Sequence, residues 1–161
     1  NNPEHKFLVH NVDILSNLCL EELWAYSSES SDAVLVVSKR KTARYLIFDD
    51  NMKLVGWTNI QTGEVKTPFN EVHETIAKLQ PNELDIEKYH LRAFAGIHYI
   101  KTKLIDFMHS WPSKFSIIDF YLKNCDCHEI KGYTLEDIKL IDVGKLHTLE
   151  DANNFATILQ E

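Results

Sequence analysis

The sequence predicts an α/β protein built on an open sheet, and three observations favour this class. Phe7–Val9 and Ala33–Val37 are short apolar runs typical of strands, and a helical pattern over residues 18–29 separates them. This order predicts a βαβ unit with a parallel strand pair. One predicted strand has an aspartate, Asp13, just beyond its carboxyl end, another ends in an aspartate, Asp142, and a helix follows each. Since open α/β sheets bind ligands beyond the carboxyl ends of their strands, we expect the fold to bring these two residues together.

Composition narrows the class of protein. The chain has 161 residues, of which 44% are hydrophobic, so we expect residues 1–161 to form a single domain with a real core. The formal net charge of −7 argues against a nucleic-acid partner, which needs clustered cations. The sequence has no apolar run near the roughly 20 residues that cross a bilayer, so we expect no membrane partner. Three cysteines, Cys19, Cys125 and Cys127, make a disulfide framework improbable and favour a cytoplasmic location.

The first half of the chain is expected to contain mainly strands. We expect Phe7–Val9 to be a buried strand, and Ala33–Val37 is apolar throughout, as in a strand covered on both faces. Tyr45–Phe48 and Met52–Trp57 predict a hairpin whose turn is Asp49–Asn51. Glu64–Lys66 predicts a further short strand after a turn at Thr62-Gly63.

The second half mixes helices and strands. Residues 68–88 contain a weak helical pattern and are a candidate insertion. The remaining elements are expected in the order strand, helix, helix, strand, strand, helix, at Tyr89–Ile100, Lys103–Ser110, Phe120–Leu122, His128–Tyr133, Lys139–Asp142 and Asp151–Leu159.

Three features of the chain have both a structural and a functional interpretation. Gly96 lies inside a strand, where it indicates either a bulge or the close approach of a ligand. Asp119 stands three residues after Ser116, which is the spacing of a helix capping box. Lys39–Arg44 holds four cations in six residues, which predicts a solvated connection or a patch that faces phosphates.

Asp13 and Asp142 could hold one divalent cation if they converge. Mg²⁺ prefers oxygen ligands and is commonly held by one or two carboxylates, with water and substrate phosphates at its other positions. Such a site would act on phosphates rather than form a structural cage. The alternative for each aspartate is a solvated loop position or a helix cap.

Five segments occur in an order that resembles a known family: FLVHNVDILSN, AVLVVSKRKTARYLIFDDNMKLVGW, AFAGIHYI, FSIIDFYL and IDVGKLHTLEDANNF. They are similar to the nucleotidyltransferases that make nucleotide sugars, in particular the mannose-1-phosphate guanylyltransferase and MurNAc-1-phosphate uridylyltransferase branches. The resemblance implies a Rossmann-like mixed sheet flanked by helices, of the nucleotide-diphospho-sugar transferase type. It also implies Mg²⁺-dependent transfer of a nucleotidyl group from an NTP to a sugar 1-phosphate, with release of pyrophosphate.

The same resemblance implies roles for five residues. Asp13 and Asp142 match the two metal-binding aspartates, and Asn11 lies beside the first. Gly96 matches the strand where the backbone approaches the sugar, and Asp119 matches a segment near the sugar phosphate.

Two of the chain's departures from the family pattern concern phosphate binding, and a third is Leu140, which stands where a tryptophan is common. It has no glycine-rich loop to grip the NTP phosphates, so we expect it to be the C-terminal half of a transferase domain, lacking the nucleotide-binding half and inactive alone. The family's E-K-P motif after the hairpin is replaced by VGWTN. The phosphate-contacting role of that lysine is therefore unfilled, or it passes to Lys66 or to the Lys39–Lys41 run.

Two other functions remain open on sequence alone. The missing loop also fits a non-catalytic domain that keeps the fold for binding or regulation. The LIFDD segment is a weak match to the aspartate nucleophile of a phosphatase, because Asp49 and Asp50 fall where the chain must reverse. Since a sheet cut in half exposes strand edges, a homodimer of the fragment is a further expectation.

Overall fold

A computed structural model of the chain describes residues 6–10, 14–16, 20–27, 31–79, 83–112, 114–136 and 140–142. Within these ranges the chain forms strands β1 to β10 and helices α1 to α4. Their bounds are β1 Lys6–His10, β2 Ile14–Ser16, α1 Leu20–Tyr26, β3 Ala33–Ser38, β4 Arg44–Phe48, β5 Leu54–Asn59, β6 Glu64–Lys66, α2 Asn70–Leu79, β7 Asp85–Ile86, β8 Tyr89–Lys101, α3 Thr102–Met108, α4 Ile117–Asn124, β9 Ile130–Leu135 and β10 Leu140–Asp142.

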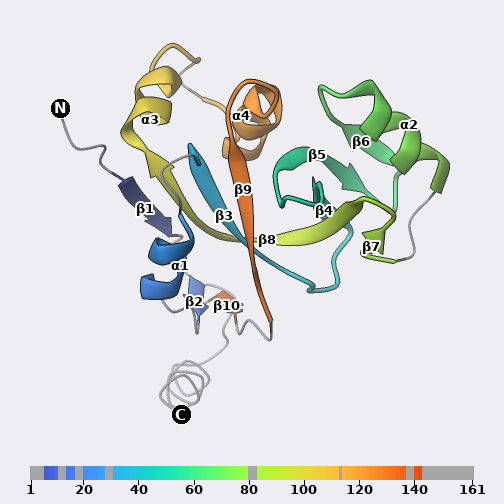
Figure 1. Cartoon of the computed structure of the whole chain (residues 1–161), viewed down its shortest axis with the longest axis horizontal. Coiled ribbons are helices and arrows are strands. Elements are labelled where there is room, and N and C mark those ends of the chain that lie inside the picture. Colours follow the sequence, from blue (N-terminus) through green and yellow to red (C-terminus); the bar gives the residue numbers. More distant parts are fainter. Residues whose placement is uncertain are drawn as a thin grey trace.

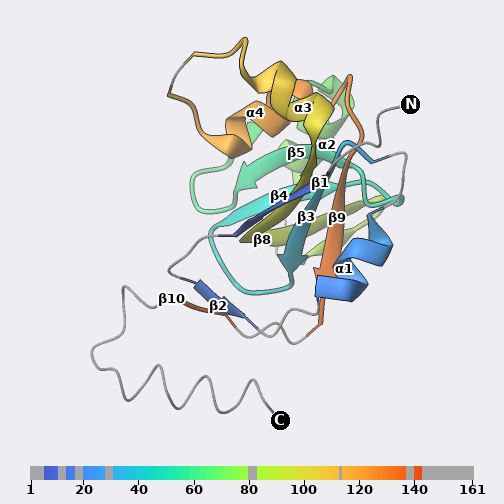
Figure 2. The ribbon, with the colours of Figure 1, turned by 90° about the vertical axis from the view of Figure 1, so that its left-hand side faces the viewer.

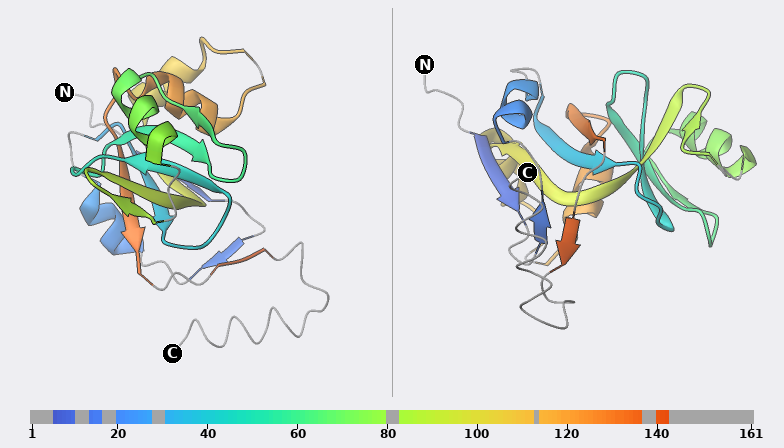
Figure 3. Two further views of the ribbon diagram at one scale, coloured as in Figure 1. Left: turned by 90° about the vertical axis from the view of Figure 1, so that its right-hand side faces the viewer. Right: turned by 90° about the horizontal axis from the view of Figure 1, so that it is seen from below.

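The long strand β8 joins the two parts of the main sheet, and Figure 1 shows it crossing the molecule from α3 to β7. Its first residues pair with β4 and β7, and its last residues pair with β1 and β3, all antiparallel. The sheet order is β6-β5-β4-β8-β3-β9, with β3 and β9 parallel. Strands β2 and β10 form a separate antiparallel pair beside this sheet, as both panels of Figure 3 show.

Helices cover the sheet on both faces, as the prediction for Ala33–Val37 requires. Val34 and Val36 pack with Leu23 of α1, whereas Leu35 and its neighbours on the opposite face pack with α3 and α4 (Figure 2). Every residue of β3 is buried, because each face of the strand has a helix over it. The predicted α/β class with a mixed sheet is therefore confirmed.

Two predictions about the first strand are wrong. Phe7, Leu8 and Val9 do form β1, but their side chains are 49%, 38% and 39% exposed. Among the described elements β1 pairs with β8 alone, so it lies at an edge of the sheet. The βαβ unit also lacks a parallel pair, because β8 lies between β1 and β3 and runs antiparallel to both.

The apolar surface of β1 leads to a testable expectation about association. Three consecutive exposed apolar residues on an edge strand favour pairing with another chain. We expect the 161-residue chain to sediment with a concentration-dependent mass, and Leu8→Lys to shift it toward monomer because a charge at this edge opposes pairing. A concentration-independent monomer in the unsubstituted chain would contradict the expected homodimer.

Most of the other predicted elements are confirmed. The hairpin β4–β5 has its turn at Asp49–Asn51, where the Asp49 carboxylate accepts hydrogen bonds from the backbone N–H groups of Asn51 and Lys53 (2.9 and 3.0 Å). Strand β2 was not predicted, since three residues are too few to show an apolar pattern. The predicted last helix lies outside the described residues. No helix within the described ranges is long and apolar enough to cross a membrane.

Candidate acceptor and metal site

Three strands of the main sheet end on the same side of the molecule. β3 and β9 are parallel, with Ser38 opposite Leu135, and β1 runs in the same direction because it too is antiparallel to β8. Their last residues, His10, Ser38 and Leu135, therefore lie toward one end of the sheet. Ligand sites of open α/β sheets are built at such an end.

The pair β2–β10 follows two of these strands in the sequence. Asp142, the last residue of β10, stands opposite Ile14, the first residue of β2. Ile14 is the residue that follows Asp13 in the sequence. Asn11 and Asp13 lie outside the described residues, and Asp142 is described by its backbone alone. The backbone register thus joins the two segments that carry the predicted metal aspartates.

Gly96 occupies a bulge in β8 close to the end of β1. Leu35 of β3 stands opposite His98 and Val37 opposite Phe94, so β8 carries extra residues here. Gly96 has a φ of +78°, a conformation that disfavours residues with a Cβ. The bulge predicted as one alternative for this glycine is confirmed, and it lies next to Ile97, the partner of His10.

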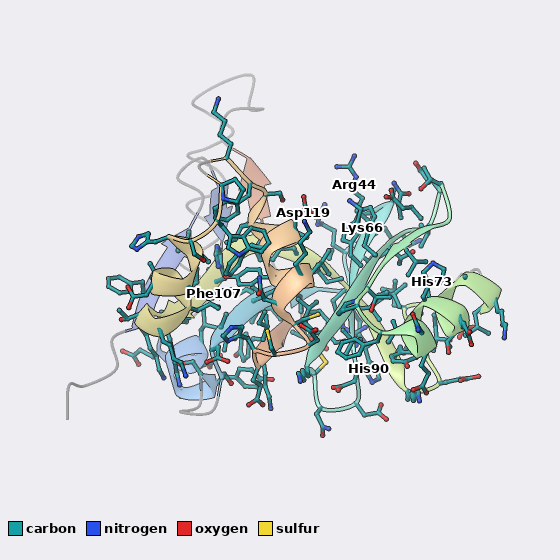
Figure 4. All side chains as sticks on the ribbon, turned by 90° about the horizontal axis from the view of Figure 1, so that it is seen from above. Arg44, Lys66, His73, His90, Phe107 and Asp119 are labelled. Atoms are coloured by element: carbon teal, nitrogen blue, oxygen red, sulfur yellow. The ribbon has the colours of Figure 1, made fainter. Side chains whose placement is uncertain are left out.

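A pocket of about 420 Å³ opens between the β4–β5–β6 hairpins and the start of α4. Its lining combines two cations, two carboxylates, an amide, an aromatic ring, a hydroxyl and two apolar side chains: Arg44, Lys66, Glu64, Asp119, Asn59, Trp57, Ser116, Ile118 and Leu122. Figure 4 shows Arg44, Lys66 and Asp119 on the same side of the molecule, with Asp119 on α4 and the cations on the strands.

Strand register explains how the polar side chains of the pocket come together. Asn59 of β5 stands opposite Arg44 on one side and Glu64 on the other. Trp57, two residues earlier and so on the same face, stands opposite Lys66. These side chains therefore form two adjacent cross-strand rows on the face that α4 covers.

Asp119 belongs to the pocket and not to a helix cap. Ser116 is the N-cap of α4, but its side chain makes no capping hydrogen bond, so the capping-box interpretation of Asp119 is wrong. Asp119 Oδ1 lies 3.9 Å from Lys66 Nζ, and the Lys66 ammonium lies 4.9 Å from the centroid of the Trp57 ring. Asp119 thus lines the pocket, and the substrate-binding role that the sequence resemblance implies for it stays a prediction.

The Lys39–Lys41 run lies on a connection and one of its cations is already paired. Lys39 Nζ lies 3.4 Å from Asp85 Oδ2, and Arg92 and His90 also bind that carboxylate. Burial alone would raise the pKa of Asp85, but the hydrogen bonds from His90 and Arg92 outweigh it and hold the pKa at about 2. Lys39 therefore takes part in this cluster, and the run lies on the connection between β3 and β4, which is one of the two alternatives that the sequence predicts.

A buried histidine lies two residues after Gly96 in β8 and contacts helix α4. His98 is 4% exposed, and its Nδ1 lies 2.5 Å from the hydroxyl of Tyr121 on α4. Burial disfavours the imidazolium and lowers the pKa of His98 to about 4. The pair thus links β8 to α4 through a neutral ring.

The His98 pKa predicts how stability depends on pH. The unfolded chain binds a proton near pH 6.5, whereas the folded chain does so only near pH 4, so stability is lost as the pH falls between these values. The loss is on the order of 3 kcal/mol. Urea unfolding at pH 7 and pH 4.5 should show a smaller drop in His98→Gln than in the unsubstituted chain; equal drops would contradict the assignment.

One of three comparisons with known proteins finds a similar fold. No family model and no curated protein matches the sequence. A solved structure of the inositol-1-phosphate CTP transferase from T. maritima is similar to this chain, with a TM-score of 0.57 and 16% sequence identity. The match covers 97% of this chain and 56% of that one, so the chain spans little more than half of its structural neighbour. The chain thus has a nucleotidyltransferase-like fold.

Proposed function

We propose that this chain is the acceptor-binding and metal-binding part of a transferase that moves a nucleotidyl group from an NTP to a sugar 1-phosphate. The nucleotidyltransferase-like fold supports the reaction class. The observation that carries the proposal is the register of β2 and β10, in which Asp142 stands opposite the residue that follows Asp13. Two segments more than a hundred residues apart in the sequence, which carry or adjoin the two aspartates, are thereby paired.

The donor set fits magnesium. Asp13 and Asp142 would each offer carboxylate oxygens, which are the ligands that Mg²⁺ prefers. Bound there, Mg²⁺ would neutralise charge on the α-phosphate. Among the described residues no group of three His, Cys, Asp or Glu side chains could hold a metal by itself. The proposed site therefore depends on these two aspartates, with the remaining positions left to water and phosphates.

The reaction balances without a covalent enzyme intermediate. An oxygen of the sugar phosphate attacks the α-phosphorus of the NTP, and the bond to the β-phosphate oxygen breaks as pyrophosphate leaves. The work of the protein is then to hold two anions in line against their mutual repulsion. In this proposal Asn11 and Gly96 lie beside the reacting groups, and Asp119 contacts the acceptor. The Gly96 bulge lets the backbone approach the acceptor without a side chain between them.

The proposal is tested by pyrophosphate release from the complete gene product that contains these residues. We expect release to require an NTP, a sugar 1-phosphate and Mg²⁺ together, and to stop when any one is omitted. Release that does not depend on the sugar phosphate would contradict the transferase. Specific binding of a protein partner with no binding of NTP or sugar phosphate would favour a regulatory domain instead.

The phosphatase alternative has a separate test. The Asp49 carboxylate already accepts two backbone hydrogen bonds within its own turn, which leaves it poorly placed as a nucleophile. Hydrolysis of a generic phosphomonoester that Asp49→Asn abolishes would be needed to support that reading. We expect no such activity.

A further inference from the structure

We propose that the pocket between the β4–β5–β6 hairpins and α4 binds the acceptor, with Arg44 and Lys66 on its phosphate and Trp57 against its sugar ring. This inference rests on the proposed function and names the residues that replace the family's E-K-P lysine. The replacement comes from other strands, since Arg44 lies on β4 and Lys66 on β6. The stretch Val55–Asn59, which stands in place of that motif, contains no cation.

Both cations are available to a bound anion. Within the described part of the chain, the Arg44 guanidinium has no ion-pair or hydrogen-bond partner. Lys66 has two carboxylates near it, Glu64 and Asp119, each at 3.9 Å and each about half exposed. Half-exposed ion pairs of this length add little to the stability of a fold, so these are weak structural contacts. A phosphate, which Arg binds through two N–H groups, would compete well for both cations.

The rest of the lining suits a polyhydroxylated ring. The half-buried Trp57 offers an aromatic face, and the neighbouring Asn59 offers both a donor and an acceptor. Asp119 and Glu64 can accept hydrogen bonds from hydroxyl groups. Because the two cations and two carboxylates balance, the pocket favours a ligand with an anionic end and a hydroxyl-rich body over a polyanion. Its volume of about 420 Å³ lies within the range of small-molecule sites.

The chain offers a matched control in the next pocket. Lys123 lies over the Trp111 ring at 5.6 Å, which repeats the cation–aromatic pair of Lys66 and Trp57 at 4.9 Å. That second pocket, of about 510 Å³, shares Ser116 and Asp119 with the first, and its second cation is Lys114 instead of an arginine. Lys123→Gln therefore removes the same charge from a similar setting outside the proposed phosphate position.

The experiment measures binding of three probes by isothermal titration to the complete gene product: glucose 1-phosphate, mannose 1-phosphate and N-acetylglucosamine 1-phosphate. We expect Arg44→Gln and Lys66→Gln each to raise the Kd of the tightest probe at least tenfold, and Trp57→Leu to raise it as well. Lys123→Gln should change it less than twofold. Methyl α-glucoside, which has no phosphate, should bind much more weakly and with no dependence on Arg44 or Lys66.

Several results would overturn the assignment. They are an unchanged Kd in Lys66→Gln, an equal loss in Lys123→Gln, equal binding of methyl α-glucoside, and no binding of any of the three probes. Failure of the proposed function gives a different pattern. If pyrophosphate release is absent but probe binding still depends on Lys66, the reaction is wrong and the pocket assignment stands.

Discussion

Asp142→Asn is expected to lower kcat for pyrophosphate release by about 10²–10³-fold, the cost of losing one group that stabilises developing charge in a closed site. Asparagine keeps the shape and one oxygen ligand, but it removes the negative charge that holds a divalent cation. Asp142 ends β10 opposite Ile14, so the substitution leaves the backbone pairing of β2 and β10 intact. The measurement is steady-state release at saturating NTP, sugar 1-phosphate and Mg²⁺.

Asp106→Asn is the control for this variant, because Asp106 is an exposed carboxylate on α3. It removes the same charge from the protein and should leave kcat within a factor of two. Activity of Asp142→Asn within about threefold of the unsubstituted protein would defeat the metal assignment.

Phe120→Ala is expected to have the largest effect on stability, a loss of about 3–5 kcal/mol in the free energy of unfolding. Phe120 is fully buried, and its ring packs against those of Trp111 and Phe115 at centroid distances of 4.9 and 5.7 Å. Truncation leaves a cavity under α4, the helix that carries Asp119. Urea unfolding monitored by circular dichroism gives the value.

Phe107→Ala tests whether the loss in the free energy of unfolding depends on how deeply a ring is buried, and not only on its contact with another ring. Phe107 also contacts the Phe120 ring, at 6.2 Å, but it is 41% exposed. Its truncation should cost no more than about 1 kcal/mol, because part of its surface already faces water. Equal losses in the two variants would show that the core does not lie under α4 as described.

The elements that could be predicted from sequence are those whose environment produces a recognisable pattern in nearby residues. Ala33–Val37 is apolar at every position because helices cover both faces of β3, and the sequence alone predicts this. The turn at Asp49–Asn51 could be predicted because its side-chain hydrogen bonds join residues close together in the sequence. Both patterns depend on residues close together in the chain.

The misassigned strand shows what such patterns leave out. An apolar run at Phe7–Val9 indicates a strand but not how many neighbours that strand has. The insertion of β8 between β1 and β3 depends on a pairing almost a hundred residues away. Strand order of this kind has no local signal in a single sequence.

The pocket was missed for a related reason. In the β4–β5 hairpin Phe48 stands opposite Leu54 but Ile47 stands opposite Gly56, so the register shifts by one residue. This shift brings Trp57 and Asn59, rather than Gly56 and Thr58, opposite the residues of β4 that face α4. A regular register counted from the turn, without this shift, would therefore place both side chains on the opposite face of the hairpin. The cations Arg44 and Lys66 were visible in the sequence, but their meeting was not.

Binding of Mg²⁺ tests the central claim, that Asp13 and Asp142 hold one metal ion between them. Isothermal titration of the complete gene product, in the presence of a non-hydrolysable NTP analogue, should show one site in the unsubstituted protein. Asp13→Asn and Asp142→Asn should each weaken binding at least tenfold, and the double variant should lose little more than either, since the two residues act on one ion. Full-affinity binding in either single variant would contradict the account.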